Sequence, residues 1–495
     1  MKKGLFALLV TVAIIFSVTA CTETYTPNLE LVDEIYSNNN GEVPENKSDE
    51  NPEICSDCEE PNLNCVCEKI SKINGFNISQ GERGSRELIN IYTFTDETVD
   101  MINFFLLNNL EFSEKYFIQL KFSNNAETHR ASVALNIDND GEDGIDLFLA
   151  DVDYAMEFAD LPGTATIAEL GIVMSESDYY TYTLDLMRKG DALMGLSHQA
   201  TPGAMYYRAD IAAKVFGIKS ENEMQELVSD WDGFIEVAQK IVDETDFKIL
   251  AGADELKRNF LNARTQGWVI DGKFNIDYDT IEEFVQVTGA IADMGGLKVN
   301  SGGQQFSTSW EAGMSDGVFA YFGSTWYLHY ILKGQADDSF GKWGMIPGPQ
   351  EFYWGGTYWF GSKSAASNKL KAEAVKQIIE FFCVDDESII AYMTKTGDFP
   401  SKKTVLKSLS ATDEQKSFFL YKTDHYPVFA EIADRIDISR NVTKYDAFMD
   451  KLFDTFINNI FSDGLPFYKA LDILSTGVRE NAPPGYLGSG LTTMR

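Results

Sequence analysis

A strand, a polar loop and a helix follow one another where the foldable part of the chain begins, and this order most constrains the fold. Residues Leu88–Phe94 form a short apolar run that is typical of a buried strand. Asp96 and Glu97 follow in the loop, and Val99–Leu110 has the spacing of an amphipathic helix. The pattern predicts an α/β unit in which a strand leads directly to a covering helix.

Two further strand candidates extend this pattern. Phe117–Phe122 leads towards the next helix, and Ile145–Ala150 is an apolar run typical of a buried strand. Strands that alternate with helices predict a mainly parallel sheet covered on both faces. Ligands bind such sheets beyond the carboxyl ends of the strands. We therefore expect Asp151 and Asp153, like the acids of the first loop, to lie at a binding edge.

The later part of the chain is mainly helical, and its length indicates more than one core. At 495 residues the chain exceeds what one ordinary core holds, so we expect two domains or two lobes. Glycine and aromatic residues cluster between Tyr353 and Phe360. The predicted helices are residues 209–216, 231–242, 280–292, 324–332, 371–383 and 444–461.

The first 21 residues have the features of a bacterial lipoprotein export signal. Lys2 and Lys3 precede the apolar run Leu5–Val18, and small residues lead to Cys21. We predict a signal peptide over residues 1–20 and lipidation of Cys21, with palmitate as an acyl chain. The protein would then be anchored at the extracellular face of the cytoplasmic membrane. An ordinary secretory signal is the alternative, whereas a spanning anchor would need a longer run of ~20 apolar residues.

Residues 21–86 are rich in Asn, Glu, Ser and Pro and lack a long apolar period. Such a stretch cannot bury enough surface to offset its ordering entropy, so we predict a flexible acidic tether. Disulfides and a small zinc site both remain open for the four thiols inside it, Cys55, Cys58, Cys65 and Cys67. Cys383 has apolar neighbours and is expected to be a buried helix residue.

The charge of the chain excludes some partners. Lys and Arg number 41 against 76 Asp and Glu, which gives a formal net charge of −35. This charge repels phosphate backbones and anionic head groups, so we expect no nucleic acid partner. A phosphate ligand would need basic residues in the site, and no basic cluster occurs near the predicted loops.

No motif in this sequence gives a convincing prediction of catalysis or cofactor binding. The four histidines form no HExxH pattern, and no phosphate-binding glycine loop occurs. One GxSxG match, Gly313–Gly317, has no buried strand before it and is interpreted as a chance loop. Paired carboxylates are abundant in so acidic a chain, so a glycoside hydrolase stays an open alternative. We predict no catalytic residue, no metal site and no cofactor.

Aromatic residues give a better indication of function. The flat C–H face of a sugar stacks on Trp and Tyr, and its hydroxyls are bound by Asp and Glu. Trp354 precedes Gly355 and Gly356, where two small residues allow the backbone to approach a ligand closely. Tyr206, Trp268 and Trp326 are further candidates near loop or helix ends, although a single aromatic residue is often part of the core.

The chain resembles the extracellular solute-binding proteins of carbohydrate ABC transporters, the group with maltose- and oligosaccharide-binding lipoproteins. The similarity extends from about Leu88 to Leu474 and rests on the order of several loose motifs. These motifs are Ile91–Glu97, Asp146–Phe148 with Asp151, Gln199–Arg208, Trp231–Phe234, Gly323–Trp326, Trp343–Pro349, Trp354–Thr357 and Gly397–Ser401.

The resemblance implies an α/β, two-lobed periplasmic-binding-protein-like fold with a hinge and an interlobe ligand cleft. It implies lobe 1 over residues 87–200 plus about 320–365, and lobe 2 over about 201–319 plus 366–480, with a tail over 481–495. By position, the first lobe would bind sugar hydroxyls through Asp96, Glu97, Asp151 and Asp153. The stacking residues would be Tyr206, Trp268, Trp326 and Trp354.

The same resemblance implies a monomer that delivers an oligosaccharide to the membrane permease subunits of an ABC transporter. A malto-oligosaccharide, as a fragment of an α-glucan, is the suggested ligand. Two alternatives stay open. One is a surface carbohydrate-active enzyme, and the other is a binding protein for a non-sugar solute, since a fold does not fix its ligand.

Overall fold

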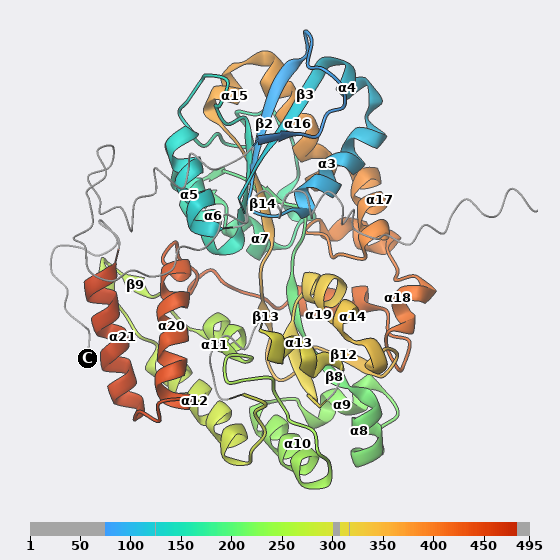
Figure 1. Ribbon diagram of the computed structural model, residues 1–495, viewed down its shortest axis with the longest axis vertical. Helices are drawn as coiled ribbons and strands as arrows, with labels where there is room; N and C mark the ends of the chain where they lie inside the picture. The colour runs from blue at the N-terminus through green and yellow to red at the C-terminus, as the bar shows by residue number, and fades with distance from the viewer. Residues whose placement is uncertain (1–74, 124, 300–306, 316, 483–495) are drawn as a thin grey trace, which may run out of the picture. The chain divides into compact units, whose positions relative to one another are not determined.

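Two β-sheets organise the protein, whose computed structural model describes residues 75–482 except 124, 300–306 and 316 (Figure 1). In the first sheet β2 is parallel to both β3 and β4, whereas β1, β14 and β7 join by antiparallel pairing. The strand order is β1 (Gly75–Asn77), β3 (Tyr116–Phe122), β2 (Glu87–Thr93), β4 (Leu147–Asp151), β14 (Thr357–Gly361) and β7 (Leu196–Ser197).

This sheet is mixed rather than mainly parallel, which corrects the expectation from the sequence. The three strands that alternate with helices in the chain, β2, β3 and β4, are parallel as predicted. β14 arrives from a distant part of the chain and pairs antiparallel with β4, from Thr357 opposite Asp151 to Gly361 opposite Leu147. Local alternation predicted the first three strands but could not predict a partner about 200 residues away.

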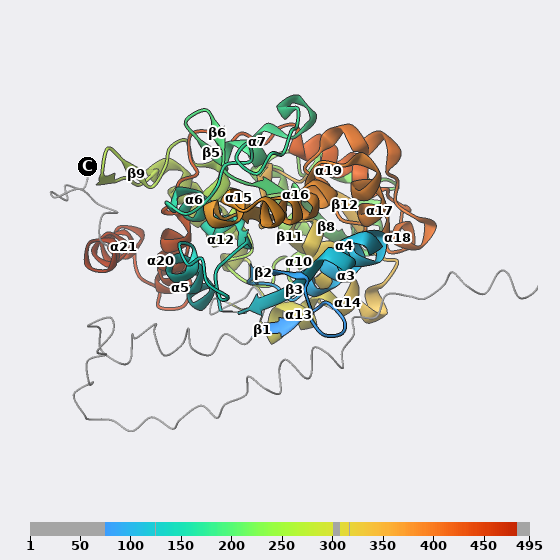
Figure 2. The same cartoon turned by 90° about the horizontal axis from the view of Figure 1, so that it is seen from above.

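Helices cover both faces of the first sheet because its side chains alternate (Figures 1 and 2). Leu147 and Leu149 of β4 share a core cluster with residues of α3 (Glu97–Asn108) and α16 (Lys369–Cys383). Phe148 and Ala150 point to the opposite face and pack with residues of α5 (Ala126–Asn136) and α6 (Val152–Asp160). The period of two along one strand therefore builds two separate apolar layers.

The second sheet is antiparallel throughout. β8 (Pro202–Arg208) lies at its centre and pairs with β11 (Ala320–Gly323), β12 (Trp343–Ile346) and β13 (Phe352–Tyr353). Its residues share a core with helices from distant parts of the chain. These helices are α8 (Ala209–Phe216), α10 (Trp231–Glu244), α11 (Lys257–Ala263), α12 (Tyr278–Asp293), α20 (Asp446–Phe461) and α21 (Phe467–Asn481).

Three segments connect the two sheets. Residues 198–201 lead from β7 to β8, and residues 354–356 lead from β13 to β14. Residues 397–401, which follow α17 (Asp386–Thr396), lie beside the first of these segments, because Ala200 N–H donates to the Phe399 carbonyl at 3.0 Å. Adjacent crossing segments of this kind form a hinge between two lobes. The two-lobed α/β fold is thus confirmed.

Strand pairing divides the lobes differently from the expectation. Residues about 320–365 were expected in the first lobe, yet β11 and β12 pair with β8 of the second sheet. Residues from 366 were expected in the second lobe, yet α16 packs on the first sheet. We propose that the first lobe comprises residues 75–197, 357–396 and 403–408, and the second 202–353 and 410–482.

The amino-terminal predictions lie mostly outside the described residues. The signal peptide, Cys21 and the four tether cysteines cannot be placed in the structure. The expected tether, residues 21–86, overlaps the fold, because residues 75–77 form β1 against the edge of β3. Cys383 is buried in α16 as a free thiol, as predicted. Within the described ranges, no helix is long and apolar enough to cross a membrane.

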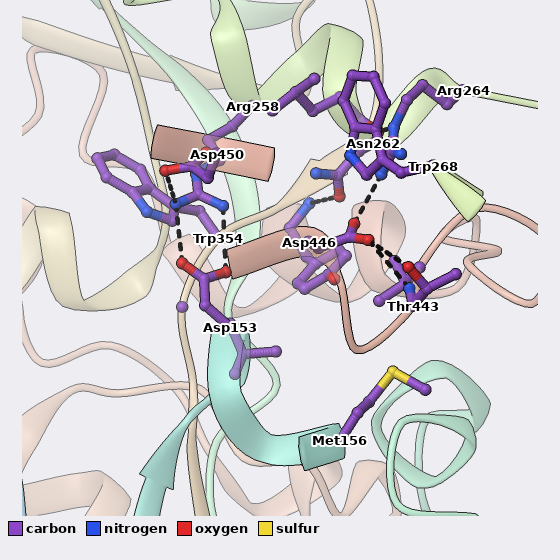
Figure 3. A pocket seen from close by; sticks show the side chains of 15 residues that line it. Asp153, Met156, Arg258, Asn262, Arg264, Trp268, Trp354, Thr443, Asp446 and Asp450 are labelled. Atoms are coloured by element: carbon purple, nitrogen blue, oxygen red, sulfur yellow. Dashed lines mark hydrogen bonds and ion pairs between the residues drawn. The ribbon is translucent and has the colours of Figure 1, made fainter. Parts of the chain in front are cut away.

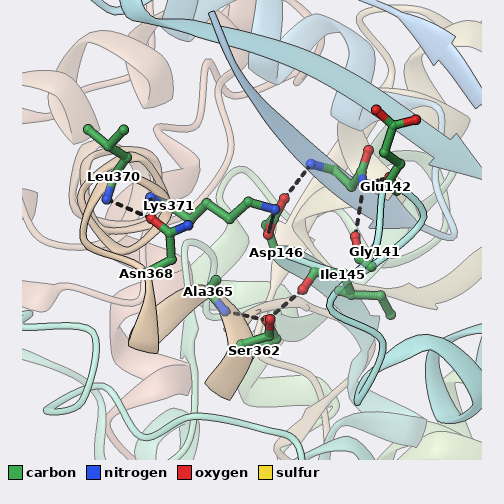
Figure 4. Close-up of polar contacts among 12 residues, drawn as sticks. Gly141, Glu142, Ile145, Asp146, Ser362, Ala365, Asn368, Leu370 and Lys371 are labelled. Atoms are coloured by element: carbon green, nitrogen blue, oxygen red, sulfur yellow. Dashed lines mark hydrogen bonds and ion pairs between the residues drawn. The ribbon is translucent and has the colours of Figure 1, made fainter.

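The buried carboxylate of Asp146 fixes the end of β4 that lies opposite Asp151 (Figure 4). It accepts hydrogen bonds from the Asn90 backbone N–H and the Lys371 ammonium, both at 2.9 Å. Ser362 donates to the Ile145 carbonyl beside it at 2.5 Å. Asp146 therefore joins two strands to the start of α16. Because its carboxylate is already bonded within the fold, the acids to consider for a ligand are those at the carboxyl end of β4.

Candidate functional site

Asp151 and Asp153 lie at the carboxyl end of β4, as expected from the strand pattern. Asp151 caps α6, where its Oδ1 accepts a hydrogen bond from the Asp153 backbone N–H at 2.9 Å. Burial and the neighbouring charge of Asp153 raise the pKa of Asp151 to about 7, against the opposing effect of Arg258. Asp151 is thus poised to exchange a proton near neutral pH.

Asp153 forms an ion pair across the lobes (Figure 3). The Arg258 guanidinium, on α11 of the second lobe, donates to the two Asp153 oxygens at 3.2 and 3.1 Å. Arg258 also lies 3.5 Å from Asp450 of α20, which in turn contacts the Lys257 ammonium at 3.2 Å. We call Asp153, Lys257, Arg258 and Asp450 the charged network. It connects α6 of one lobe to α11 and α20 of the other.

A second ion pair, between an arginine and an aspartate, lies beside the charged network (Figure 3). Arg264 donates to Asp446 at 2.6 Å, and its guanidinium carbon lies 4.3 Å from the centre of the Trp268 ring. Trp268 is only 1% exposed and stacks on Phe274. The arginine side chain thus covers Trp268, which contributes a wall instead of an open stacking surface.

Trp326 and Trp354 contact each other at the hinge. Their ring centres are 4.8 Å apart in an edge-to-face arrangement, and the Trp326 indole N–H donates to the Trp354 carbonyl at 3.0 Å. Gly355 follows with a φ of +80°, and a Cβ there would lie 2.6 Å from Trp326 Nε1. Only glycine combines this backbone conformation with so close an approach. The sequence led us to expect a close approach to a ligand here, whereas the structure shows that Gly355 lies close to the Trp326 side chain.

A small cavity lies among these residues, and we call it the interlobe cavity. Its volume is about 30 Å³, which is close to the share of liquid volume of one water molecule, ~30 Å³. Residues of both lobes line it, including Asp153, Arg258, Trp268, Trp354 and Asp450. In this arrangement the lobes leave no room for a sugar ring, so a ligand could enter only when they separate.

Three buried polar atoms around the interlobe cavity lack hydrogen-bond partners among the described residues. They are Arg258 Nε, Arg264 Nη1 and Asp450 Oδ1. Two of these atoms are donors and one is an acceptor. Native proteins leave few buried polar atoms unsatisfied, so a group of them at one cavity needs an explanation. A ligand that both donates and accepts hydrogen bonds would satisfy all three.

Glu97, the other predicted strand-end acid, belongs to a different group. Its carboxylate accepts hydrogen bonds from the hydroxyls of Tyr330 and Tyr392, both at 3.2 Å. Burial, with a contribution from Asp398, raises the pKa of Glu97 to about 7. Burial also raises the pKa of Asp398 to about 6, although Thr325 and the Phe399 backbone N–H both donate to it. We call Glu97 and Asp398 the hydroxyl-bonded acids.

His198 completes a cluster with the hydroxyl-bonded acids that has the composition of a metal site. One ligand atom from each of the three residues lies within 4.8 Å of the others. The Trp359 indole N–H, however, can only donate, and it lies 3.1 Å from His198 Nδ1. The side-chain amide nitrogen of Gln199 lies 3.1 Å from His198 Nε2, so both ring nitrogens already contact hydrogen-bonding side chains. We assign this cluster to hydrogen bonding.

The structure brings five of the eight predicted residues together and separates Asp96, Glu97 and Tyr206 from them. Asp153, Trp268 and Trp354 line the interlobe cavity, and Asp151 lies next to them. Trp326 contacts this group through Trp354. Asp96 is exposed at the start of α3. Tyr206 is fully buried in a core cluster shared by both sheets, and its hydroxyl donates to the Ser324 carbonyl at 3.1 Å.

The sequence analysis did not predict the positively charged residues of this site. The expectation that no basic cluster lies near the motif loops was wrong, because Arg258 contacts Asp153 and lies 5.9 Å from the Trp354 ring centre. Lys257, Arg258 and Arg264 lie close together on and after α11 in a very acidic chain. This local concentration of basic residues was the sequence feature that could have predicted them. Their partners, Asp446 and Asp450, are distant in sequence and gave none.

The GxSxG match does not form a nucleophile elbow. Gly313, Met314 and Ser315 belong to α13 (Thr308–Ser315), whereas an elbow places the serine between a strand and a helix. This arrangement agrees with the interpretation of the match as a chance occurrence. It gives Ser315 no resemblance to a catalytic serine of this type.

Two lobes, a hinge of crossing segments and a polar cavity between the lobes define a ligand-binding protein that encloses its solute. The sequence agrees with this class, since residues 111–417 match the model of the family described as bacterial extracellular solute-binding protein. The chain belongs to this family of extracellular proteins. A comparison with curated protein sequences gave no significant match.

Solved structures support the same fold at low sequence identity. A family 1 extracellular solute-binding protein is 15% identical with a TM-score of 0.66, and the match covers 80% of this chain and 99% of that one. The sugar-binding protein MalE of Xanthomonas citri is 16% identical with a TM-score of 0.61, over 79% and 96%. The lacto-N-biose-binding protein of Bifidobacterium longum is 13% identical with a TM-score of 0.62, over 80% and 98%.

Proposed function

We propose that this protein is the substrate-binding component of an ABC importer and that it captures an oligosaccharide outside the cell. The family supports capture of an extracellular solute. Several proteins of the same fold carry sugars in their structures, such as β-1,6-galactobiose in the protein from B. animalis subsp. lactis. We further propose that the protein acts as a monomer, without catalysis, and delivers its ligand to membrane permease subunits.

The observation that carries the sugar proposal is the mixture of unsatisfied atoms beside Trp354. Arg258 Nε can donate a hydrogen bond, Asp450 Oδ1 can accept one, and neither has a partner among the described residues. A purely anionic ligand would need donors only, whereas each sugar hydroxyl both donates and accepts. Trp354 adds an apolar surface for the face of the ring. This combination favours an uncharged polyhydroxyl group at the interlobe cavity.

Binding in this proposal requires the lobes to open and close. The interlobe cavity of about 30 Å³ is too small for a sugar ring, so the ligand would enter an open form. A ligand that contacts both Asp153 of the first lobe and Arg258 of the second favours closure by its differential affinity for the closed state. The closed, loaded form would be the one presented to the permease.

Calorimetric titration of the purified protein tests the sugar proposal. Malto-, xylo-, manno- and fructo-oligosaccharides form the panel, and a malto-oligosaccharide is the first candidate. We expect one class to bind, and Trp354→Ala to weaken it by about 10- to 100-fold, the effect of losing a buried aromatic surface. Trp354→Tyr is the matched control, because it keeps an aromatic ring and should retain most of the affinity.

The outcomes of this titration separate the open alternatives. No heat with any class, in a folded protein, would favour a non-sugar solute. Release of shortened products from a bound oligosaccharide would instead favour a carbohydrate-active enzyme. Equal affinities of the Trp354→Ala variant and the original protein would remove the interlobe cavity as the binding site.

We also propose that Cys21 carries the lipid anchor. The small residues before it and the apolar run Leu5–Val18 support cleavage and lipidation at this position. Cys21→Ser should abolish incorporation of labelled palmitate and release the protein from the membrane fraction. Cys55→Ser is the control, because it removes a tether thiol without changing the signal. Unchanged labelling of the Cys21→Ser variant would reject the anchor.

A further inference from the structure

A second, larger cavity lies next to the interlobe cavity. This outer cavity has a volume of about 380 Å³ and shares two wall residues, Asn262 and Arg264, with the interlobe cavity. Its other walls come from residues 350–352, which lead into β13, and 435–441, which precede α20. Ligand sites commonly measure ~300–1,000 Å³. The outer cavity can therefore receive part of a ligand without any separation of the lobes.

Positive side chains outnumber negative ones in the lining of the outer cavity. Three arginines line it against two carboxylates, Glu351 and Asp437. The interlobe cavity has the opposite balance, with two arginines against three aspartates. Arg435 and Arg264 are also paired with carboxylates outside this lining, Glu431 and Asp446, so attraction of an anionic group depends on Arg440.

The three arginines differ in their ion-pair partners. Arg435 is paired with Glu351 at 2.7 Å and with Glu431 at 2.6 Å. Arg264 is paired with Asp446. Arg440 is exposed and forms no ion pair with the residues that the structure describes, but its charge adds to the hydrogen bonds from Ser439 that lower the pKa of Asp437. A guanidinium of this kind can bind a carboxylate through two parallel hydrogen bonds.

The wall between the two cavities holds a buried acceptor and a buried donor that lack partners in the described part of the chain. These atoms are Asn441 Oδ1 and Arg264 Nη1, on side chains that are 3% and 4% exposed. The Asn441 side-chain amide also donates to the Asn262 carbonyl, so the wall residues are connected. The wall residues of the outer cavity thus include one acceptor and one donor whose hydrogen-bonding capacity is unused in the described structure.

We propose that the outer cavity is a second sugar subsite and that it selects a unit carrying a carboxylate, as in a uronic acid. The inference rests on the proposed function, because it assumes a sugar in the adjacent interlobe cavity. The neutral unit would occupy the interlobe cavity beside Trp354. The acidic unit would occupy the outer cavity with its carboxylate against Arg440. The ligand would then be an acidic oligosaccharide instead of a neutral α-glucan fragment.

A matched pair of ligands tests this subsite. One is a disaccharide that contains a uronic acid, and the other is the same disaccharide with its carboxyl group reduced to an alcohol. In calorimetric titrations at low salt we expect the acidic disaccharide to bind about five-fold more tightly, the effect of one partly exposed ion pair. The difference should shrink as salt is added, since exposed charges are screened.

Two variants locate the effect. Arg440→Gln should remove the preference for the acidic disaccharide while the affinity for the neutral one is retained. Arg479→Gln is the control of equal charge change, because Arg479 lies on α21, does not line either cavity, and donates to Thr476 of the same helix at 2.8 Å. This control should keep the preference. An equal loss with both variants would show a long-range charge effect and overturn the subsite.

The remaining outcomes distinguish this inference from the proposed function. Equal binding of both disaccharides, sensitive to Trp354→Ala but not to Arg440→Gln, would overturn the acidic subsite and leave the sugar function intact. Binding of the acidic disaccharide that depends on Arg440 but not on Trp354 would support the outer cavity and overturn the interlobe site. Failure of both disaccharides to bind the folded protein would overturn the acidic subsite.

Discussion

The charged network and the hydroxyl-bonded acids hold buried carboxylates in opposite ways. Burial alone would raise the pKa of Asp450, but Arg258 and Lys257 outweigh it and hold that pKa below its usual range. Glu97 has tyrosine hydroxyls instead of a cation, and burial raises its pKa to about 7. A nearby cation thus decides whether a buried carboxyl keeps or loses its proton. Asp450 therefore keeps its negative charge near neutral pH, whereas Glu97 can exchange a proton there.

A continuous set of contacts connects these two regions. Thr325 donates to Asp398 of the hydroxyl-bonded acids, and the next residue, Trp326, donates to the Trp354 carbonyl. The Arg258 guanidinium of the charged network lies 5.9 Å from the Trp354 ring centre. The two regions therefore belong to one continuous set of side-chain contacts at the hinge.

Removal of the cation should give the largest effect. In the Arg258→Met variant, Asp153 and Asp450 lose the guanidinium between them and remain in a partly buried site. We expect the free energy of unfolding to fall by ~3–5 kcal/mol, as for other broken buried ion pairs. Urea denaturation at pH 7 measures the change.

Arg188→Met is the control for the charged network. Arg188 pairs with Glu176 at 2.7 Å near the surface, where ion pairs contribute at most ~1 kcal/mol. Similar losses in the two variants would show that Arg258 has no special role. Partial recovery in an Arg258→Met, Asp153→Asn double variant would show that the uncompensated carboxylates cause the loss.

A substitution between the two regions should have the next largest effect. Gly355→Ala combines a φ of +80° with a Cβ placed 2.6 Å from Trp326 Nε1. We expect a loss of about 3 kcal/mol in stability, from backbone strain and from overpacking together. Thermal or urea unfolding measures it.

Gly171→Ala separates the two causes. Gly171 has a φ of +73°, but a Cβ there would meet no atom within 4 Å. This variant should lose only the strain, about 1–2 kcal/mol. If both variants lose the same amount, the contact between Gly355 and Trp326 contributes nothing to stability.

The order of elements was predictable from the sequence because it depends on local patterns. Residues 209–216 form α8 as predicted, and Leu88–Phe94 corresponds to β2 within one residue at each end. The strand-end position of Asp151 also followed from an apolar run before it. These features need only the period of a strand or helix and its neighbours in the chain.

The partners across the lobes were not predictable, because they depend on distant pairing. Nothing near Asp153 in the sequence indicates Arg258, which lies 105 residues away. Tyr206 was expected as a stacking residue, yet every residue of β8 is buried, so its ring lies in the core. A central strand covered on both faces has no alternation that would distinguish a cleft residue from a core residue.

The hydroxyl-bonded acids should make stability depend on pH. The pKa of Glu97 is about 7 in the folded protein against 4.5 in the unfolded chain. Its protonated form therefore stabilises the fold below pH 4.5, and this contribution is lost as the pH rises through 7. In the Glu97→Gln variant the side chain stays uncharged. We expect the two proteins to match near pH 4.5 and the variant to be more stable at pH 8 by about 2 kcal/mol, after allowance for partial exposure.

Denaturation at several pH values checks this sign. Glu114→Gln is the control, because Glu114 is exposed on α4 (Leu110–Lys115) and its replacement changes the charge equally. The pH dependence that Glu97 causes should remain in this control. A Glu97→Gln variant that loses stability as the pH rises would contradict the assignment of a retained proton to Glu97.

The smallest effect should come from a single hydroxyl of this group. Tyr330 is 41% exposed, and its hydroxyl donates to Glu97 at 3.2 Å and lowers the pKa of that carboxyl. Tyr330→Phe should lower the free energy of unfolding at pH 8 by about 0.5–1 kcal/mol, the usual net contribution of one hydrogen bond. With Tyr392 as its remaining hydroxyl donor, the charged form of Glu97 is less stabilised, so the pKa of Glu97 should rise further. Tyr330→Phe in the Glu97→Gln background should cause no such rise, since no carboxylate is left to titrate there.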